Sequence, residues 1–103
     1  MKRSVYLKHY YTIKNLIKKL GTDGADDYLR GNLSRFSKQV STARKNICSI
    51  KKSILMQNNS AEKGRLEYDL NEAINVLNDL LEKLKTADEM YLCYINYIRK
   101  KSS

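Results

Sequence analysis

The sequence contains no proline and no tryptophan, and only four of its 103 residues are glycine. Three of these, Gly21, Gly24 and Gly31, fall close together, so most of the chain has no residue that breaks a helix. A β-sandwich or barrel would need turn residues about every 8–12 positions. The hydrophobic content of 42% is enough for a core, and this chain length suits one domain. We therefore expect a single all-α domain spanning residues 1–103.

Cysteine and histidine are scarce, with Cys48, Cys93 and His9 as the only examples. A structural zinc site needs about four ligands, so we expect no metal and no other cofactor. A catalytic cysteine would need a base beside it, and the acidic pair Asp26 and Asp27 suits the start of a helix better than catalysis. We expect a non-enzymatic protein whose two thiols are free and reduced.

A long hydrophobic run is also missing, since no stretch approaches the roughly 18 apolar residues of a membrane span. The N-terminus carries Lys2 and Arg3, but Lys8, His9 and Lys14 interrupt the apolar residues that follow. This pattern differs from that of a secretory signal peptide. We expect an intracellular protein, with export by a leaderless route as the alternative.

Apolar residues recur at alternating spacings of four and three, which is the heptad pattern of packed helices. The first series predicts a helix over residues 3–20 that ends at Gly21. The second predicts a helix over residues 25–57, after an acidic turn in which Asp23 is the cap. The two series are Tyr6, Tyr10, Ile13, Ile17 and Leu20, and then Leu29, Leu33, Phe36, Val40, Ala43, Ile47, Ile50 and Ile54.

A third series predicts a helix over residues 60–101, with Asn59 and Glu62 spaced as in a capping box. Its members are Leu66, Leu70, Ala73, Leu77, Leu80, Leu84, Ala87, Tyr91, Tyr94 and Ile98. A second capping-box pattern begins at Thr86, so the alternative is a separate fourth helix from about residue 86. The heptad spacing continues across this position and favours one helix.

Three such helices joined by short turns predict an antiparallel up-down-up three-helix bundle, in which a long helical hairpin packs with a shorter N-terminal helix. At about 1.5 Å per residue, the helices measure roughly 27, 50 and 60 Å. The first helix should therefore run parallel to the third and cover only the half of the hairpin near residues 21–27.

Acidic residues are absent from residues 1–20 and 33–57, whereas residues 60–98 contain eight acidic and four basic residues. We expect these opposite charges on neighbouring helices to select the pairing of the helices. Basic residues of the second helix should also form an outward stripe, with three of them at the outermost heptad position. The stripe consists of Lys38, Arg44, Lys45, Lys51 and Lys52.

The predicted lengths leave the far half of the hairpin without a third helix. Apolar side chains there should keep part of their surface in water, and exposed apolar patches often mark contacts between proteins. The alternative is a simple two-stranded coiled coil. The predicted partner-binding residues are Ile47, Ile50, Ile54, Leu55, Met56, Leu66 and Leu70.

These features predict a non-catalytic helical interaction module, such as an adaptor, an assembly subunit or a chaperone-like partner, that acts through coiled-coil packing. We expect a protein partner or a second copy of the chain, as in a homo-oligomer, and no membrane contact. The alternative is a basic helical protein that binds nucleic acid through the lysine and arginine stripe, by contacts to backbone phosphates.

A third alternative comes from size and shape. A small helical hairpin of this length resembles the WXG100-type partners of type VII secretion systems, but residues 58–60, Asn-Asn-Ser, stand where those proteins have a Trp-x-Gly turn. Small basic four-helix bacteriocin immunity proteins are similar in size and charge, without a shared motif. This alternative is a small secretion-system partner or an immunity-like protein.

Overall fold

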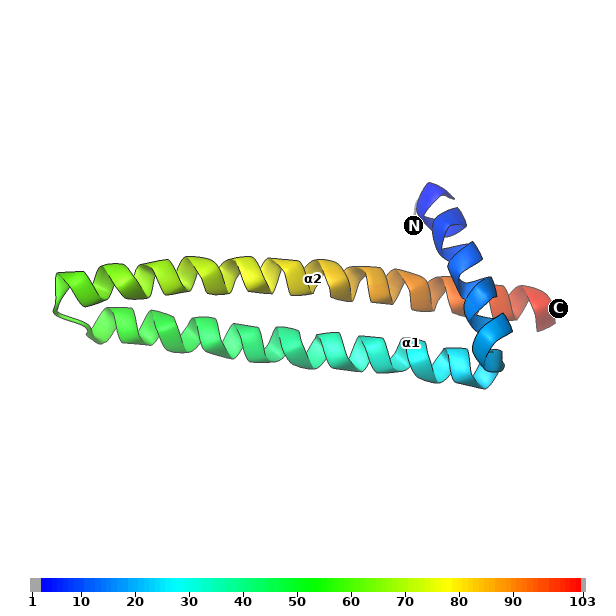
Figure 1. Cartoon of the computed structure of the whole chain (residues 1–103), viewed down its shortest axis with the longest axis horizontal. Coiled ribbons are helices and arrows are strands. Elements are labelled where there is room, and N and C mark those ends of the chain that lie inside the picture. Colours follow the sequence, from blue (N-terminus) through cyan, green and yellow to red (C-terminus); the bar gives the residue numbers. More distant parts are fainter. Residues whose placement is uncertain (1–2, 103) are drawn as a thin grey trace. The chain divides into compact units, whose positions relative to one another are not determined.

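The computed structural model contains two helices, and it describes the backbone of residues 3–102 and the side chains of residues 8–100. Helix α1 spans Arg3–Met56, residues 57–59 form the connection, and α2 spans Ser60–Ser102 antiparallel to α1 (Figure 1). No strand occurs within residues 3–102. The prediction of an all-α fold is confirmed, and the prediction of three separate helices is wrong.

The break predicted at Gly21 is a kink within α1 rather than its end. Gly21 has a φ of 77° and a ψ of 171°, a left-handed conformation that glycine adopts at little cost. The helix resumes at once, so residues 22–27 are helical where we expected an acidic turn with Asp23 as the cap. Helical geometry lets Asp26 pair with Arg30 one turn later, at 3.0 Å, which favours helix over turn in this stretch.

Contacts within the chain define two compact units. We call Met1–Arg35 together with Leu84–Ser103 the crossed unit, and Phe36–Lys83 the hairpin unit. Each helix contributes to both units. That the whole chain forms one domain remains a prediction.

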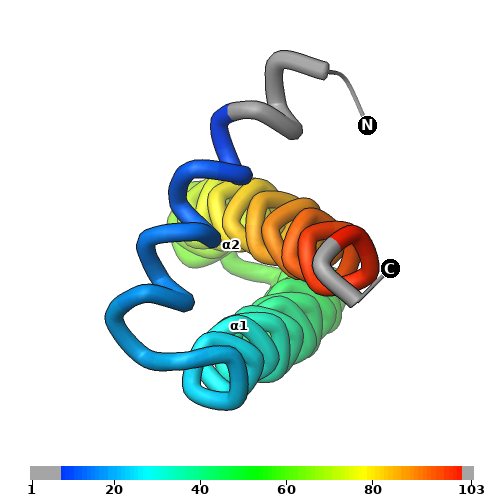
Figure 2. The backbone as a smooth tube through the Cα atoms, turned by 90° about the vertical axis from the view of Figure 1, so that its right-hand side faces the viewer, coloured from blue at the N-terminus to red at the C-terminus, as the bar shows by residue number. Residues whose placement is uncertain are grey.

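In the crossed unit, three helical segments surround one core: α1 before Gly21, α1 after Gly21, and the end of α2. Residues 8–20 cross the α2 segment steeply (Figures 1 and 2), so the prediction that they run parallel to the last helix is wrong. The kink at Gly21 gives them this direction. The largest fully buried side chains of the core, those of Ile13, Leu29 and Cys93, expose 2% of their surface or less.

In the hairpin unit, α1 and α2 pack as an antiparallel pair along one apolar seam. Each predicted heptad position there is buried or half-buried, but only Val40, Ile47 and Ala73 are buried, and none is less than 5% exposed. Two helices therefore cover the seam only in part. The seam consists of Phe36, Val40, Ala43, Ile47, Ile50, Ile54, Leu66, Leu70, Ala73, Leu77 and Leu80.

Asn59 caps α2, as predicted. Its Oδ1 accepts hydrogen bonds from the backbone N–H groups of Ala61 at 2.9 Å and Glu62 at 3.3 Å. The other half of the expected capping box is replaced, because the backbone N–H of Asn59 donates to Oε1 of Gln57 at 3.1 Å. Helix α2 then continues through Thr86, which excludes a fourth helix starting at that residue.

Candidate interaction surface

The predicted partner-binding residues all lie in the hairpin unit, and the structure divides them into three groups. Ile47 is buried in the seam, whereas Leu55 and Met56 expose 85% and 83% of their surface. The helical rotation of about 100° per residue carries these two side chains off the seam face marked by Ile54. The half-buried group, which lies along the seam, consists of Ile50, Ile54, Leu66 and Leu70.

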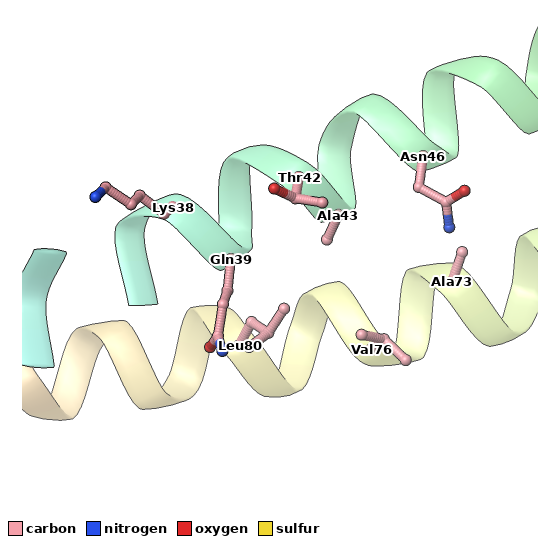
Figure 3. Close-up of a pocket in the computed structure, with 8 residues that line it drawn as sticks. All are labelled: Lys38, Gln39, Thr42, Ala43, Asn46, Ala73, Val76 and Leu80. Atoms are coloured by element: carbon pink, nitrogen blue, oxygen red, sulfur yellow. The ribbon is translucent and has the colours of Figure 1, made fainter. Parts of the chain in front are cut away.

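A groove with a volume of about 620 Å³ opens along one face of the hairpin unit (Figure 3). Ala43 and Ala73 line it at seam positions that elsewhere hold larger aliphatic or aromatic residues. Because both helices contribute a methyl group here, they leave a hollow between them. The groove is lined by Lys38, Gln39, Thr42, Ala43 and Asn46 of α1 and by Ala73, Val76 and Leu80 of α2.

The groove face is almost free of charge, with Lys38 at one edge as its only ionisable lining residue. Gln39, Thr42 and Asn46 are spaced three and four apart, so they form one uncharged flank of α1. On α2, Val76 is 53% exposed. The partner-binding prediction did not include these residues. The signal in the sequence was the small residue in each of the two heptad series, Ala43 and Ala73. Two such alanines create a hollow only where the packing of the helices brings them near each other, which the sequence does not show.

The charged residues of the hairpin unit are exposed and unpaired between the helices. All five residues of the predicted basic stripe are exposed on α1. Within residues 36–83, no ion pair joins α1 to α2, so the expectation that opposite charges select the pairing has no support there. The apolar seam holds this unit together. The acidic residues of α2 that are also exposed are Glu62, Glu67, Asp69, Glu72, Asp79 and Glu82.

A polar cluster in the crossed unit ties α1 to α2. The Tyr91 hydroxyl donates to Oδ1 of Asp26 at 3.1 Å and accepts from Nε of Arg30 at 2.9 Å. The hydrogen bond with Tyr91 and the charge of Asp26 raise the pKa of Arg30 above its usual range. The Tyr94 hydroxyl donates to the backbone oxygen of Thr22 at 3.2 Å. These groups satisfy one another, which explains the cluster as a structural feature.

The remaining reactive side chains also have structural surroundings. The buried His9 has its Nε2 3.5 Å from Oε2 of Glu89. Both cysteines are free, Cys48 exposed and Cys93 buried. Burial raises the pKa of the Cys93 thiol, and the Glu89 carboxylate raises it further, so the nucleophilic thiolate is disfavoured. Within the described residues, no three His, Cys, Asp or Glu side chains gather in a way that would hold a metal ion.

No helix in the described part of the chain is both long and apolar enough to cross a membrane. Comparison with known proteins gave no match, whether to a family model, to a curated protein or to a solved structure. The guide to function is therefore the surface of the hairpin unit.

Proposed function

We propose that the protein is a non-catalytic helical interaction module, in which the hairpin unit packs against helices of another protein molecule. The incomplete burial of this unit is the main support: its seam is half-covered, and Leu55 and Met56 at the end of α1 are exposed. In the crossed unit a third helical segment completes the core. A partner helix would do the same for the hairpin unit.

The energetics indicate how much of the hairpin unit the partner must cover. Full burial of Leu55 and Met56 contributes about 1.5–3 kcal/mol each. Association costs about 4–15 kcal/mol in lost translational and rotational freedom. These two side chains alone do not reach the upper part of that range. We therefore expect the partner to lie along the seam as well as at the end of the hairpin unit.

The double variant Leu55→Ser, Met56→Ser tests this function. Both side chains are exposed, so the helical circular dichroism signal should not change, while the loss of apolar contact should weaken partner binding by about 100-fold or more. The partner is identified by affinity purification with the tagged chain, and its affinity is then measured by calorimetry with purified components.

A matched control is Tyr11→Ser, which removes an exposed apolar side chain from the crossed unit. This variant should bind the purified partner with the affinity of the wild type. Equal affinities for the wild type and the double variant would contradict the proposed role of the hairpin unit.

Nucleic-acid binding is a second candidate, favoured by one observation. The basic stripe on α1 is exposed, and no acidic residue of α2 within residues 36–83 pairs with it. Five unneutralised basic side chains on one helix would attract backbone phosphates and release counterions. Contacts of this kind carry no base specificity.

Fluorescence anisotropy with a labelled single-stranded oligonucleotide tests this candidate at about 50 mM salt, where electrostatic attraction is strong. The triple variant Lys38→Glu, Lys45→Glu, Lys52→Glu should lose binding and keep its helical circular dichroism signal. Failure of the wild type to bind under these conditions would rule the candidate out.

The control for this test is Lys14→Glu, Lys18→Glu, Lys19→Glu, which makes the same change in net charge in the crossed unit, where these three lysines are also exposed. If the stripe is the binding site, this control keeps most of the affinity. Equal losses for the two triple variants would show that only the overall charge of the chain matters.

A further inference from the structure

The groove face is the part of the hairpin unit best suited to receive another helical surface, because it is hollow and carries one charged residue, Lys38, at its edge. We propose that a second copy of the chain covers it. Two hairpin units stack groove to groove about a twofold axis parallel to the helices, so that α1 of each copy lies against α2 of the other. This inference rests on the proposed function, because it names the partner of that interaction module.

Two identical hairpins can stack through the same face in two symmetric ways. A twofold axis parallel to the helices places α1 of one copy against α2 of the second copy. A twofold axis across the helices places α1 on α1 and α2 on α2. In both arrangements neighbouring helices are antiparallel and form a four-helix bundle, so helix direction does not distinguish them.

Charge does distinguish them. In the hairpin unit, α1 carries five basic residues and no acidic residue, whereas α2 carries six acidic and three basic residues. Stacking α1 on α1 would bring like charges together, which opposes association. Pairing α1 with α2 of the second copy brings opposite charges together. These charges form no ion pair between the helices of their own hairpin unit, so they are available to a second copy.

The edges of the groove carry the residues that would meet. Lys38 lines the α1 edge, and Lys45 repeats its helical position seven residues later. Val76 lines the α2 edge, with Glu72 four residues before it and Asp79 three residues after it on the same side. A twofold axis parallel to the helices sets these two edges side by side. Lys38 and Lys45 of one copy then lie next to the acidic edge of the second copy.

The groove-lining residues of α1 and α2 also lie at the same height along the helix axis. Figure 3 shows Asn46 beside Ala73 and Gln39 beside Leu80. An axis parallel to the helices preserves this level. Thr42, which lies between Gln39 and Asn46 on α1, therefore faces the Val76 region of the second copy. The exposed Val76 side chains enter the hollow, and the uncharged polar groups exchange hydrogen bonds without burying a charge.

The size of the face predicts a dimer that forms with increasing concentration. Two helices about 10 Å wide, in contact over about 20 residues, offer roughly 600 Å² per copy, or about 1,200 Å² in total. Stable interfaces begin near this value. Sedimentation equilibrium should therefore show the full-length wild type passing from monomer to dimer between about 1 μM and 1 mM.

The first test places a charge in the inferred interface. Val76→Lys should raise the dimer dissociation constant about tenfold or more, because the lysine ammonium would have to leave water to enter the hollow and would face Lys38 and Lys45 of the second copy. Asn78→Lys adds the same charge at an exposed position of α2 that does not line the groove, and should leave the constant unchanged. Circular dichroism checks that both variants keep their helices.

The second test distinguishes the two arrangements by disulfide formation. In a Cys48→Ser background, chains carrying Thr42→Cys are mixed with chains carrying Val76→Cys and oxidised. Because each chain has one new cysteine, a link between the two chains must be intermolecular. The inferred arrangement predicts this link. A parallel mixture of Asn46→Cys with Gln39→Cys reports α1 stacked on α1, and should give little product.

Two results together would support the inference. Val76→Lys weakens dimerisation whereas Asn78→Lys does not, and the disulfide forms between positions 42 and 76. A link between positions 46 and 39 in its place would overturn the arrangement. A wild type that stays monomeric at all concentrations would overturn the second copy as the occupant. Neither negative result contradicts the proposed function, which fails only if Leu55→Ser, Met56→Ser leaves partner binding unchanged.

Discussion

The crossed unit and the hairpin unit are built from the same two helices with the same heptad spacing, yet their burial differs. Ile13 and Leu29 in the crossed unit are 0% and 1% exposed, whereas the best-buried residue of the hairpin unit, Val40, is 5% exposed. The difference follows from the number of helical segments: three in the first case and two in the second. A heptad series thus predicts which side of a helix faces a neighbour, but not how many neighbours there are.

The largest expected effect is a difference between two leucine truncations. Leu29→Ala removes a fully buried side chain of the crossed unit and should cost about 2–5 kcal/mol of unfolding free energy. Leu70→Ala removes a half-buried side chain of the hairpin unit and should cost about half as much. Urea denaturation at low protein concentration, followed by circular dichroism, measures both. Equal losses would mean that a partner or a second copy already covers the hairpin unit.

The next largest effect on stability concerns the kink at Gly21, which divides α1 into two segments and so gives the crossed unit three helical segments. Gly21→Ala should destabilise the chain by about 1–2 kcal/mol, because an L-residue disfavours a positive φ. The substitution meets no other atom within 4 Å, so the cost is conformational. Gly31→Ala, at a helical position with equally open surroundings, should stabilise by up to about 1 kcal/mol.

Thermal denaturation of these two alanine variants gives opposite shifts if the kink is needed. Stabilisation by both substitutions would mean that α1 can straighten at Gly21 without loss. In that case the crossed unit would not depend on the direction of residues 8–20, and the contrast between the two units would have another cause.

A smaller effect tests the polar cluster of the crossed unit. Tyr91→Phe removes the hydroxyl that bonds to Asp26 and Arg30, and should cost about 0.5–1.5 kcal/mol. The control Tyr68→Phe removes an exposed hydroxyl from the hairpin unit, and should change stability by less than about 0.5 kcal/mol. A change in unfolding free energy below about 0.5 kcal/mol for Tyr91→Phe as well would show that hydrogen bonds to water replace those to Asp26 and Arg30 at no cost in stability.

Much of the local structure was predictable from residue spacing and cap chemistry. The heptad series correctly predicted the seam of the hairpin unit, and Asn59 was correctly identified as the cap of α2. The break at Gly21 was predicted at the right residue. Leu20, the last residue of the first series, is exposed beside the kink, and the side chain of Tyr6, its first residue, lies outside the described residues.

The direction of residues 8–20 and the groove were not predictable in the same way. A glycine with positive φ can end a helix or redirect it, and the sequence pattern is the same in both cases. The hollow at Ala43 and Ala73 depends on how the two helices are aligned, which the spacing within each helix does not determine. Within residues 36–83, opposite net charges on the two helices did not predict ion pairs, because the apolar seam and not the charges sets the rotation of the helices.

The smallest effect is a dependence of stability on pH that comes from Cys93 in the crossed unit. Burial, and secondarily the Glu89 carboxylate, raise the pKa of its thiol, so the folded state favours the protonated form. This contribution is complete below the thiol pKa of the unfolded chain, about 8.5, and is lost as pH rises through the higher pKa of the folded state. We expect the unfolding free energy to fall as pH rises above about 8.5, the thiol pKa of the unfolded chain. Urea titrations at several pH values test this against Cys93→Ala, which should be less stable throughout but lack this part of the slope. The same slope in both proteins would mean that the thiol does not contribute.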